Sequence, residues 1–514
     1  MNLLNSIIYP DTFKAQFFLV FVSIVVYFLS MPGSPLPLLT CIAFVPIALA
    51  ISEASPRRAA FLFYIAAMGC ILIVIWWLIP AVVKFTRLNV YLAFIVLIVF
   101  SMILSIPYAI VGWVVSYKKW FDHKFGTLLI SACFVVVVTL FPRPLPGNYA
   151  HSLYEYPMLI QLLDIGGVPI LLFAVLFVNL QLVKAIRLAN KDSSRAIRAL
   201  LIALVTIGLV CLYGVVKIKK NEQLASDGHQ LKVGIVQPKL ERESSLDRLY
   251  SMSEQLVRVN PNLDLIVWPE FPTAFSYVGN PRDKANVDQM IARLKVPVVI
   301  VSGYIYEEGA DPSNPKAQYF NTAHLIDKNR KLKASYPKQT LVPFFEYLPY
   351  EETFPFLREL FPDTLRYVPG ENTELFHLDE NTHIIPLICY EIVFPGMTQK
   401  FVAQGGNLII NLTNDIWLGD TQGSAYHFAL GLFRAVEHRL PWVRATNSGI
   451  SGLVSAVGKI DPASITRNQS KATRVYDVVI PVDRSFYSQF GDVFLFILIG
   501  FFIVNLFRKG RSKK

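Results

Sequence analysis

The chain has 514 residues, of which 54% are hydrophobic and 17% are charged, and it carries a formal net charge of +11 at pH 7. So high a hydrophobic content excludes an ordinary soluble enzyme, whereas the charged residues exclude a chain that lies wholly in a membrane. The mixture predicts two parts, one embedded in a membrane and one exposed to water.

Apolar runs fill residues 1–218, which we predict to be a membrane domain. Most of these runs reach the ~20 residues that a helix needs to cross ~30 Å of hydrocarbon. The first run is not followed by a small-residue cleavage pattern, so we interpret it as a retained helix and not as a signal peptide. We expect seven spans before a polar domain and one after it, near residues 13–31, 35–52, 59–82, 89–117, 126–141, 165–184, 199–216 and 491–507.

Lysine and arginine in the short loops predict the orientation of these spans. With a cytoplasmic N-terminus, the basic loops and the basic C-terminal tail all lie inside, and the outside loops hold only Lys84, Arg87 and Arg143. The polar domain, residues 219–489, is then extracytoplasmic, and the segment 490–514 returns the chain to the cytoplasm. The positive net charge is therefore explained by the Lys and Arg residues of the cytoplasmic loops and tail. The polar domain has abundant Asp and Glu and no recognisable nucleic-acid motif, so we expect no nucleic-acid partner.

Short runs rich in Val and Ile alternate with amphipathic stretches in the polar domain. This alternation is typical of an α/β layered fold. The predicted strands cover residues 231–237, 263–270, 296–306, 322–327, 384–390, 407–414 and 442–446. The predicted helices cover residues 245–259, 287–294, 397–404 and 424–438.

Three strand-like runs of this domain lead into residues that can carry chemistry: Glu270, Lys338 and Cys389. Cys389 is the only cysteine between residues 219 and 489, so it cannot form a disulfide within the domain. Taken singly, such a cysteine is more often packed in a core, and such a Glu or Lys is most often on the surface. Together they supply the base, the cation and the nucleophile that acyl transfer requires.

The sequence around these residues resembles the nitrilase superfamily and, within it, the apolipoprotein N-acyltransferase family. The resemblance is carried by the order Glu, Lys, Cys, by seven preceding spans and one following span, and by residues 267–270, 336–349, 389–391, 413–420 and 444–449. It implies a multi-pass α-helical membrane domain joined to an extracytoplasmic, nitrilase-like αββα sandwich. It also implies a place in the bacterial inner membrane, with a periplasmic catalytic domain and both termini in the cytoplasm.

The resemblance implies a two-step acyl transfer. Glu270 takes the proton of Cys389, the thiolate attacks an ester carbonyl of a membrane phospholipid, and Lys338 stabilises the oxyanion. The thioester on Cys389 is then attacked by the α-amino group of the diacylglyceryl-cysteine of an apolipoprotein. This exchange needs no ATP and no coenzyme, and we expect a monomer.

Supporting roles are implied for Glu346, Tyr390 and Glu391. By resemblance Glu346 orients Lys338 or shares its charge, while Tyr390 and Glu391 shape the site beside the sulfur. Ordinary packing of Tyr390 and a surface loop position of Glu391 are the alternatives. The eight histidines show no metal-ligand spacing and no phosphate-cradling glycine motif is present, so we expect no metal and no cofactor.

The chain departs from the family pattern at two places. Family members usually read Gln-Gly-Asn where this chain has Gln237, Pro238 and Lys239, and they usually have glycine where this chain has Phe345. Either departure predicts a change of substrate preference. An aromatic stretch around the second place predicts either a lid at the depth of the lipid headgroups or a buried subcore. It comprises Phe344, Phe345, Tyr347, Tyr350, Phe354, Phe356 and Phe361.

Two other functions are compatible with parts of the sequence. A membrane-tethered nitrilase-type amidase or hydrolase would use the same three residues with water as the acceptor. A transporter or binding protein would have lost catalysis, which the intact Glu270, Lys338 and Cys389 disfavour, as does the scarcity of charged residues within the spans. The sequence does not separate the hydrolase from the transferase.

Overall fold

The structure is a computed structural model that describes residues 12–86, 88–225, 227–241, 245–270, 276–305 and 319–508. It contains two compact units, which we call the helical unit (Met1–Trp76, Phe94–Ile218 and Phe490–Lys514) and the sheet unit (Trp77–Ala93 and Lys219–Gln489). Residue 306 of a predicted strand and the basic tail beyond residue 508 lie outside the described residues.

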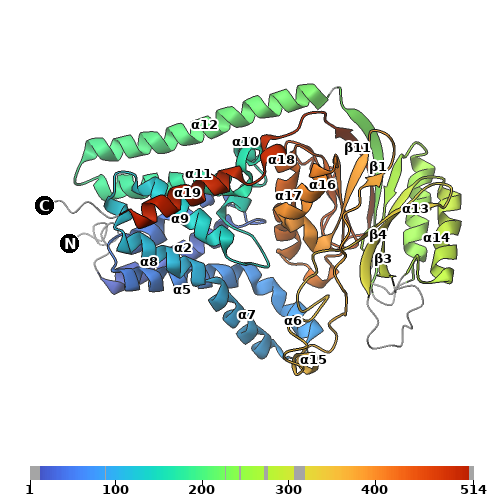
Figure 1. The fold of residues 1–514 in the computed structure, drawn as a ribbon, viewed down its shortest axis with the longest axis horizontal. Helices are drawn as coiled ribbons and strands as arrows, with labels where there is room; N and C mark the ends of the chain where they lie inside the picture. Colours follow the sequence, from blue (N-terminus) through green and yellow to red (C-terminus); the bar gives the residue numbers. More distant parts are fainter. Residues whose placement is uncertain are drawn as a thin grey trace. The chain divides into compact units, whose positions relative to one another are not determined.

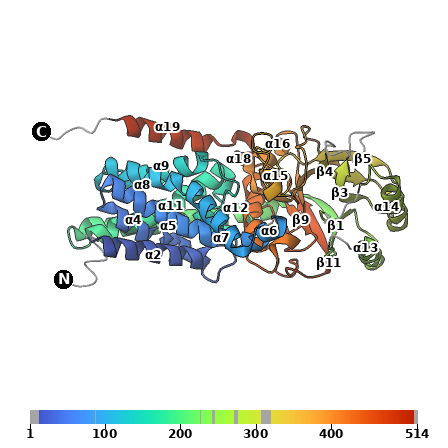
Figure 2. The same cartoon turned by 90° about the horizontal axis from the view of Figure 1, so that it is seen from below.

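The helical unit contains a helix in each of the eight predicted apolar runs (Figures 1 and 2). In the described residues, five helical stretches are long and apolar enough to cross a membrane, and three further apolar stretches are shorter. The principal helices are α2 (Phe13–Ser30), α3 (Thr40–Ala43), α4 (Val45–Ser52), α5 (Pro56–Ile75), α7 (Val90–Leu104), α8 (Ile106–Tyr117), α9 (Gly126–Leu140), α10 (Pro157–Ile160), α11 (Leu163–Leu188), α12 (Ser193–Ala225) and α19 (Val493–Phe507).

Proline and glycine divide the longer apolar runs. The run near 89–117 breaks at Ser105 between α7 and α8, because Pro107 has no backbone N–H with which to continue the helix. Gly166 and Gly167 leave helical geometry inside α11, and Gly167 has a positive φ of 61° that glycine adopts without strain. The apolar pattern therefore predicts where helices lie better than where they bend.

Residues 77–93, assigned from sequence to the membrane domain, belong instead to the sheet unit. They include α6 (Ile79–Phe85). Trp77 is buried against Trp417, with ring centroids 6.4 Å apart, and against Gly423. A Cβ at Gly423 would approach the Trp77 ring to 2.9 Å, so glycine makes this close packing possible. Hydropathy could not reveal this, because apolar side chains are suited both to lipid and to a protein surface.

The sheet unit is built from two sheets, one six-stranded and one five-stranded. The first has the order β11 (Ala472–Ile480), β1 (His229–Gln237), β2 (Leu265–Val267), β3 (Val298–Ile305), β4 (Phe320–Ile326), β5 (Leu332–Pro337). The second has the order β10 (Gly452–Val454), β9 (Trp442–Thr446), β8 (Leu408–Thr413), β7 (His383–Ile388), β6 (Phe376–His377). The sheets contact each other, so they form the centre of a sandwich.

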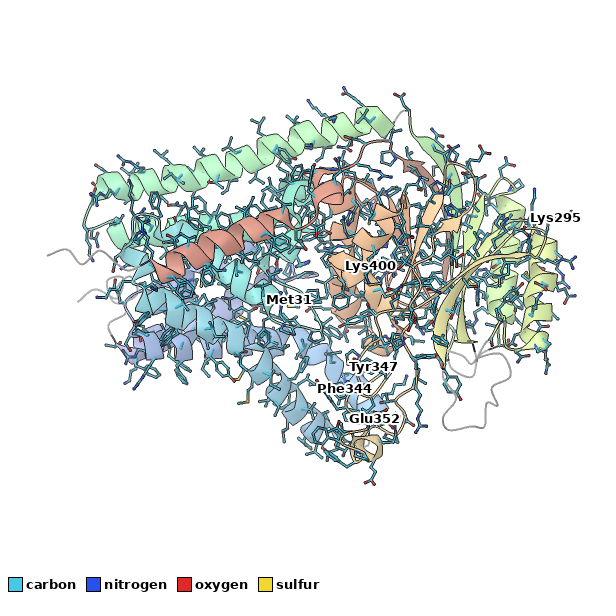
Figure 3. All side chains as sticks on the ribbon, viewed as in Figure 1. Met31, Lys295, Phe344, Tyr347, Glu352 and Lys400 are labelled. Atoms are coloured by element: carbon cyan, nitrogen blue, oxygen red, sulfur yellow. The ribbon has the colours of Figure 1, made fainter. Side chains whose placement is uncertain are left out.

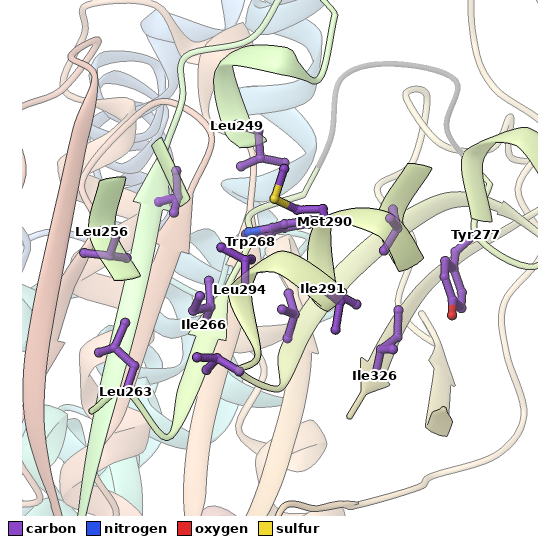
Figure 4. Close-up of a cluster of buried hydrophobic side chains, with 14 of the residues drawn as sticks. Leu249, Leu256, Leu263, Ile266, Trp268, Tyr277, Met290, Ile291, Leu294 and Ile326 are labelled. Atoms are coloured by element: carbon purple, nitrogen blue, oxygen red, sulfur yellow. The ribbon is translucent and has the colours of Figure 1, made fainter. Parts of the chain in front are cut away.

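Two helices cover the outer face of each sheet (Figure 1). The first sheet carries α13 (Asp247–Val259) and α14 (Pro281–Leu294), and the second carries α16 (Pro395–Ala403) and α17 (Gly423–His438). Under α13 and α14, apolar side chains at helical spacing pack on Ile266 and Trp268 of the sheet layer (Figure 4). The Trp268 indole N–H donates to Ser253 Oγ at 3.0 Å, so this large side chain is buried with its donor satisfied. The layers are thus αββα.

The predicted strands and helices of the polar domain are all present, with different ends. The short strands β6 and β10 and the edge strand β11 were not predicted, and α14 begins six residues before the predicted helix. Its start is set by Asn280, whose side chain accepts from Arg282 N at 2.9 Å, followed by Pro281 in the first turn. β1 pairs in parallel with β2, and β8 pairs in parallel with both β7 and β9. This pairing brings the carboxyl ends of the strands in each sheet to a common edge.

Candidate active site

Each of the three predicted site residues lies just after a strand. Glu270 follows β2, Lys338 follows β5 directly, and Cys389 follows β7 directly. Cys389 has a φ of 52°, in the left-handed region that costs a non-glycine residue energy. The surrounding structure therefore holds the sulfur at a sharp turn between β7 and the one-turn helix η5 (Cys389–Val393).

The structure brings these three side chains together. Cys389 and Glu270 lie close enough for each to shift the pKa of the other. Lys338 Nζ lies 3.8 Å from Glu270 Oε1, and its side chain is only 1% exposed. A thiol, a carboxylate and an ammonium thus share a site that excludes most water, where electrostatic interactions are strong.

Two further residues hold Lys338 and Glu270 in place. Lys338 Nζ donates to Glu346 Oε1 at 2.8 Å, and Val342 N donates to Glu346 Oε2 at 2.8 Å. Asn321 Nδ2 donates to Glu270 Oε1 at 2.8 Å and to Glu346 Oε1 at 3.2 Å. The sequence pointed to Glu346 but not to Asn321, which lies on β4, 17 residues before Lys338. An asparagine within an apolar strand was the only available signal.

Burial and charge set the pKa values of the site. Burial raises the pKa of Glu270 and Glu346 adds to the rise, while Lys338 opposes it. Burial alone would lower the pKa of Lys338, but Glu346 and Glu270 outweigh it and raise that pKa. Burial and the Glu270 charge raise the pKa of Cys389, with Lys338 acting against them. The resting site therefore holds a thiol beside an ammonium, and the thiolate forms only when a base removes the proton.

Glu391 is fully buried and connects two of the strand ends. Its Oε2 accepts from Ile388 N at 2.9 Å, immediately before Cys389. Its Oε1 accepts from Tyr336 Oη at 2.8 Å and from Gln339 N at 2.7 Å, on either side of the Lys338 position. This carboxylate is therefore not a surface loop acid, and it holds the turn at Cys389 against the segment that carries Lys338.

A second buried polar network lies behind Cys389. Asn411 Nδ2 donates to Cys389 O at 3.2 Å, and Arg444 Nη1 donates to Asn411 Oδ1 at 3.1 Å. Arg444 Nη2 donates to Asp415 Oδ2 at 2.7 Å, and His427 Nδ1 lies 3.0 Å from Asp415 Oδ1. Burial acts to raise the pKa of Asp415, but Arg444 and His427 outweigh it and lower that pKa. No role was predicted from sequence for this network, whose members come from β8, the turn after β8, α17 and β9.

Arg444→Met is expected to destabilise the sheet unit by ~3–5 kcal/mol, because it leaves the Asp415 carboxylate buried without its cation. Arg444 and Asp415 are both fully buried. Thermal unfolding in detergent would measure the change. Removing both charges in Arg444→Met with Asp415→Leu is expected to recover part of the loss, and a single variant as stable as the wild type would contradict this role.

Tyr390 and Phe345 flank the site through aromatic contacts. Tyr390 packs edge-on against Phe394, with centroids 4.8 Å apart, and burial raises its pKa. Phe345 packs against Trp417 at 5.3 Å. The left-handed backbone position belongs to its neighbour Phe344, whose φ is 65°. Phe345 therefore occupies the usual glycine position without needing glycine geometry.

The other departure, at Pro238, lies in a fixed loop. Lys239 has a φ of 51°, and its N–H donates to Asn447 O at 2.9 Å. Asn447 also exchanges two side-chain hydrogen bonds with the backbone of Leu240, both 2.8 Å long. The chain after β1 is thereby attached to the segment that follows β9.

The aromatic stretch after Lys338 is not a buried subcore. Tyr350, Phe354 and Phe356 are 76%, 47% and 56% exposed, and Phe344 is exposed as well. Phe344 and Tyr347 lie together with Glu352 in this segment (Figure 3). Four of its seven rings are therefore exposed, whereas Phe345, Tyr347 and Phe361 are half-buried. In the described part of the chain, no group of three or more His, Cys, Asp or Glu residues could hold a metal ion.

Comparison with known proteins separates the two parts of the chain. Residues 231–469 match the carbon-nitrogen hydrolase family model, and residues 23–181 match the model of the apolipoprotein N-acyltransferase N-terminal domain. An apolipoprotein N-acyltransferase of Geobacter metallireducens is 28% identical over 91% of this chain and 90% of its own length. This chain belongs to the apolipoprotein N-acyltransferase family. A Brucella suis apolipoprotein N-acyltransferase is 33% identical over 51% of this chain and 50% of its own.

Membership of the apolipoprotein N-acyltransferase family confirms the predicted fold class, a membrane domain joined to a nitrilase-like sandwich. It also identifies the chain as an enzyme of the carbon-nitrogen hydrolase superfamily. The apolar helices and the family are consistent with an inner-membrane protein. Among solved structures, an amidase from Nesterenkonia sp. is similar, with 20% identity and a TM-score of 0.37 over 51% of this chain and 93% of the amidase.

Proposed function

We propose that this protein transfers an acyl chain from a membrane phospholipid to the α-amino group of the diacylglyceryl-cysteine of an apolipoprotein. The observation that supports this most is the clustering of Cys389, Glu270 and Lys338, each of which shifts the pKa of the other two. The family supports the choice of donor and acceptor. The sheet unit then works outside the cytoplasm, where an exchange of ester for amide proceeds without ATP.

In the first step Glu270 accepts the proton of Cys389 as the sulfur attacks the ester carbonyl carbon. The carbonyl π electrons move to oxygen, and Lys338, with nearby backbone N–H groups, stabilises the oxyanion. The intermediate collapses and breaks the ester C–O bond, and Glu270 returns the proton to the departing lysophospholipid. One negative charge moves from the carboxylate through the attacking sulfur to the carbonyl oxygen and then to the leaving oxygen. It returns to the carboxylate when Glu270 gives up the proton, so the net charge of the buried site stays constant.

In the second step the neutral α-amino group attacks the thioester carbonyl. Glu270 accepts the amine proton, the C–S bond breaks, and the proton passes to the thiolate, which restores the thiol. The product is an amide, and the acyl group has left Cys389. An amine is a far better nucleophile than water, which favours transfer over hydrolysis. Exclusion of water from this buried site favours transfer further.

Purified protein incubated with a phospholipid that carries a labelled acyl chain is expected to gain one acyl mass on the peptide that contains Cys389. Adding a diacylglyceryl-cysteine peptide is expected to discharge this adduct into an N-acyl peptide. Intact-mass spectrometry would follow both steps. Release of free fatty acid at the same rate with and without the peptide would favour the hydrolase, and the absence of any adduct would contradict the proposal.

A further inference from the structure

Asn321 lies between the two carboxylates of the candidate site. Its Nδ2 donates to Glu270 Oε1 at 2.8 Å and to Glu346 Oε1 at 3.2 Å. Lys338 Nζ lies 3.8 and 2.8 Å from the same two oxygens. The facing oxygens are therefore bridged twice, once by an ammonium and once by a neutral amide.

The position of Asn321 is fixed from several directions. The residue is 4% exposed, and its backbone oxygen accepts from Lys338 N at 2.7 Å. One β4 residue thus aligns both the chain at the lysine and the carboxylate of Glu270. The reverse amide orientation would place Oδ1 against two carboxylate oxygens and is disfavoured by repulsion.

The chemistry of the amide restricts where the catalytic proton can go. An amide N–H only donates, so it needs an unprotonated oxygen opposite it. Both facing Oε1 atoms are therefore acceptors and carry no proton. A proton that leaves Cys389 has to reach the other oxygen of Glu270.

We infer that Asn321 is a positioning residue that keeps Glu270 available as the base, by occupying Oε1 and leaving Oε2 to accept the Cys389 proton. This inference rests on the proposed role of Glu270 in acyl transfer. Without the amide, two buried carboxylates lose a shared donor, and among the described residues Lys338 alone still bridges them. Glu270 then binds a proton more tightly, since burial and the Glu346 charge both favour its neutral form.

The pH dependence of Cys389 reactivity tests this role in Asn321→Ala and Asn321→Ser. Glu270 acts as a base only when ionised, so the reaction slows as the pH falls through its pKa. The amide lowers that pKa. In Asn321→Ala the acidic limb of the pH–rate profile should therefore move to higher pH by about one unit. Serine retains one donor and is expected to give a smaller shift. Two rates would be measured: alkylation of Cys389 by iodoacetamide without lipid, and acylation by phospholipid.

Thr322→Ser is the matched control, because neighbouring strand residues point to opposite faces of the sheet. Thr322→Ser is expected to leave the acidic limb of the pH–rate profile unmoved. Thermal unfolding would confirm that each variant folds. If Asn321→Ala does not fold, Asn321→Ser carries the test. A uniform loss at every pH with an unmoved limb would overturn the inference. A shifted alkylation limb without lipid acylation of the wild type would sustain it and overturn the proposed function instead.

Discussion

Cys389→Ala is expected to abolish acyl transfer, with a loss of at least ~10⁴-fold, because the Cys389 sulfur is the proposed carrier of the acyl group. The labelled acyl adduct should be absent from the purified variant. In cells that depend on this enzyme, lipoproteins should keep a free N-terminal amine. Mass spectrometry of the N-terminal lipopeptides would measure this directly.

Cys211→Ala is the control for the cysteine variant. Cys211 is a free cysteine in α12 and has no role in the proposed mechanism. The Cys211→Ala variant should therefore keep full activity. Cys389→Ser tests the sulfur itself, since a hydroxyl in the same place is a weaker nucleophile. An acyl adduct on Cys389→Ala equal to that of the wild type would place the intermediate elsewhere and contradict the mechanism.

Lys338→Met is expected to slow acyl-enzyme formation by ~10³-fold or more, through two separate effects. The oxyanion loses its nearest cation. In addition, Glu270 and Glu346 lose the ammonium that lies 3.8 and 2.8 Å from their facing oxygens. One carboxylate then takes up a proton, because two close buried charges cannot both persist, and a protonated Glu270 is no longer a base. Single-turnover acylation of Cys389 would measure the combined loss.

Lys400→Met provides the comparison for the lysine variant. Lys400 lies on the exposed side of α16 (Figure 3), so removing its charge should leave acylation within about twofold of the wild type. Lys338→Arg keeps a cation but changes its shape, and it should retain more activity than methionine. A Lys338→Met enzyme with more than a tenth of the wild-type rate would contradict a role for this lysine in the oxyanion site.

The aromatic stretch after Lys338 is a region whose sequence fits a lid at headgroup depth and a buried subcore equally well. Seven aromatic residues within 18 positions fit a subcore as well as a surface. Exposure depends on whether other elements cover the rings, and Tyr350 at 76% is not covered within the described chain. Covering contacts come from residues distant in sequence, so local composition could not decide between the alternatives.

The sequence by itself determined the apolar helices, the strand and helix alternation and the strand ends at Glu270, Lys338 and Cys389. These features depend on local periodicity and on residue chemistry, which a chain carries in its own order. The chemical needs of acyl transfer then linked the three residues before their distances were known. Glu346 followed from resemblance, and the structure places it 2.8 Å from Lys338.

Only the tertiary structure decided which residues of other strands complete the site. Asn321 on β4 meets Glu270 across 51 positions, and Arg444 reaches Asp415 across 29. The assignment of residues 77–93 to the sheet unit depends likewise on Trp77 packing against Trp417. Such contacts are set by strand pairing and by packing between layers, and a buried polar group shows its role only when its hydrogen-bond partner is known. The sequence supplied the reacting groups, and the fold selected the neighbours that control their protons.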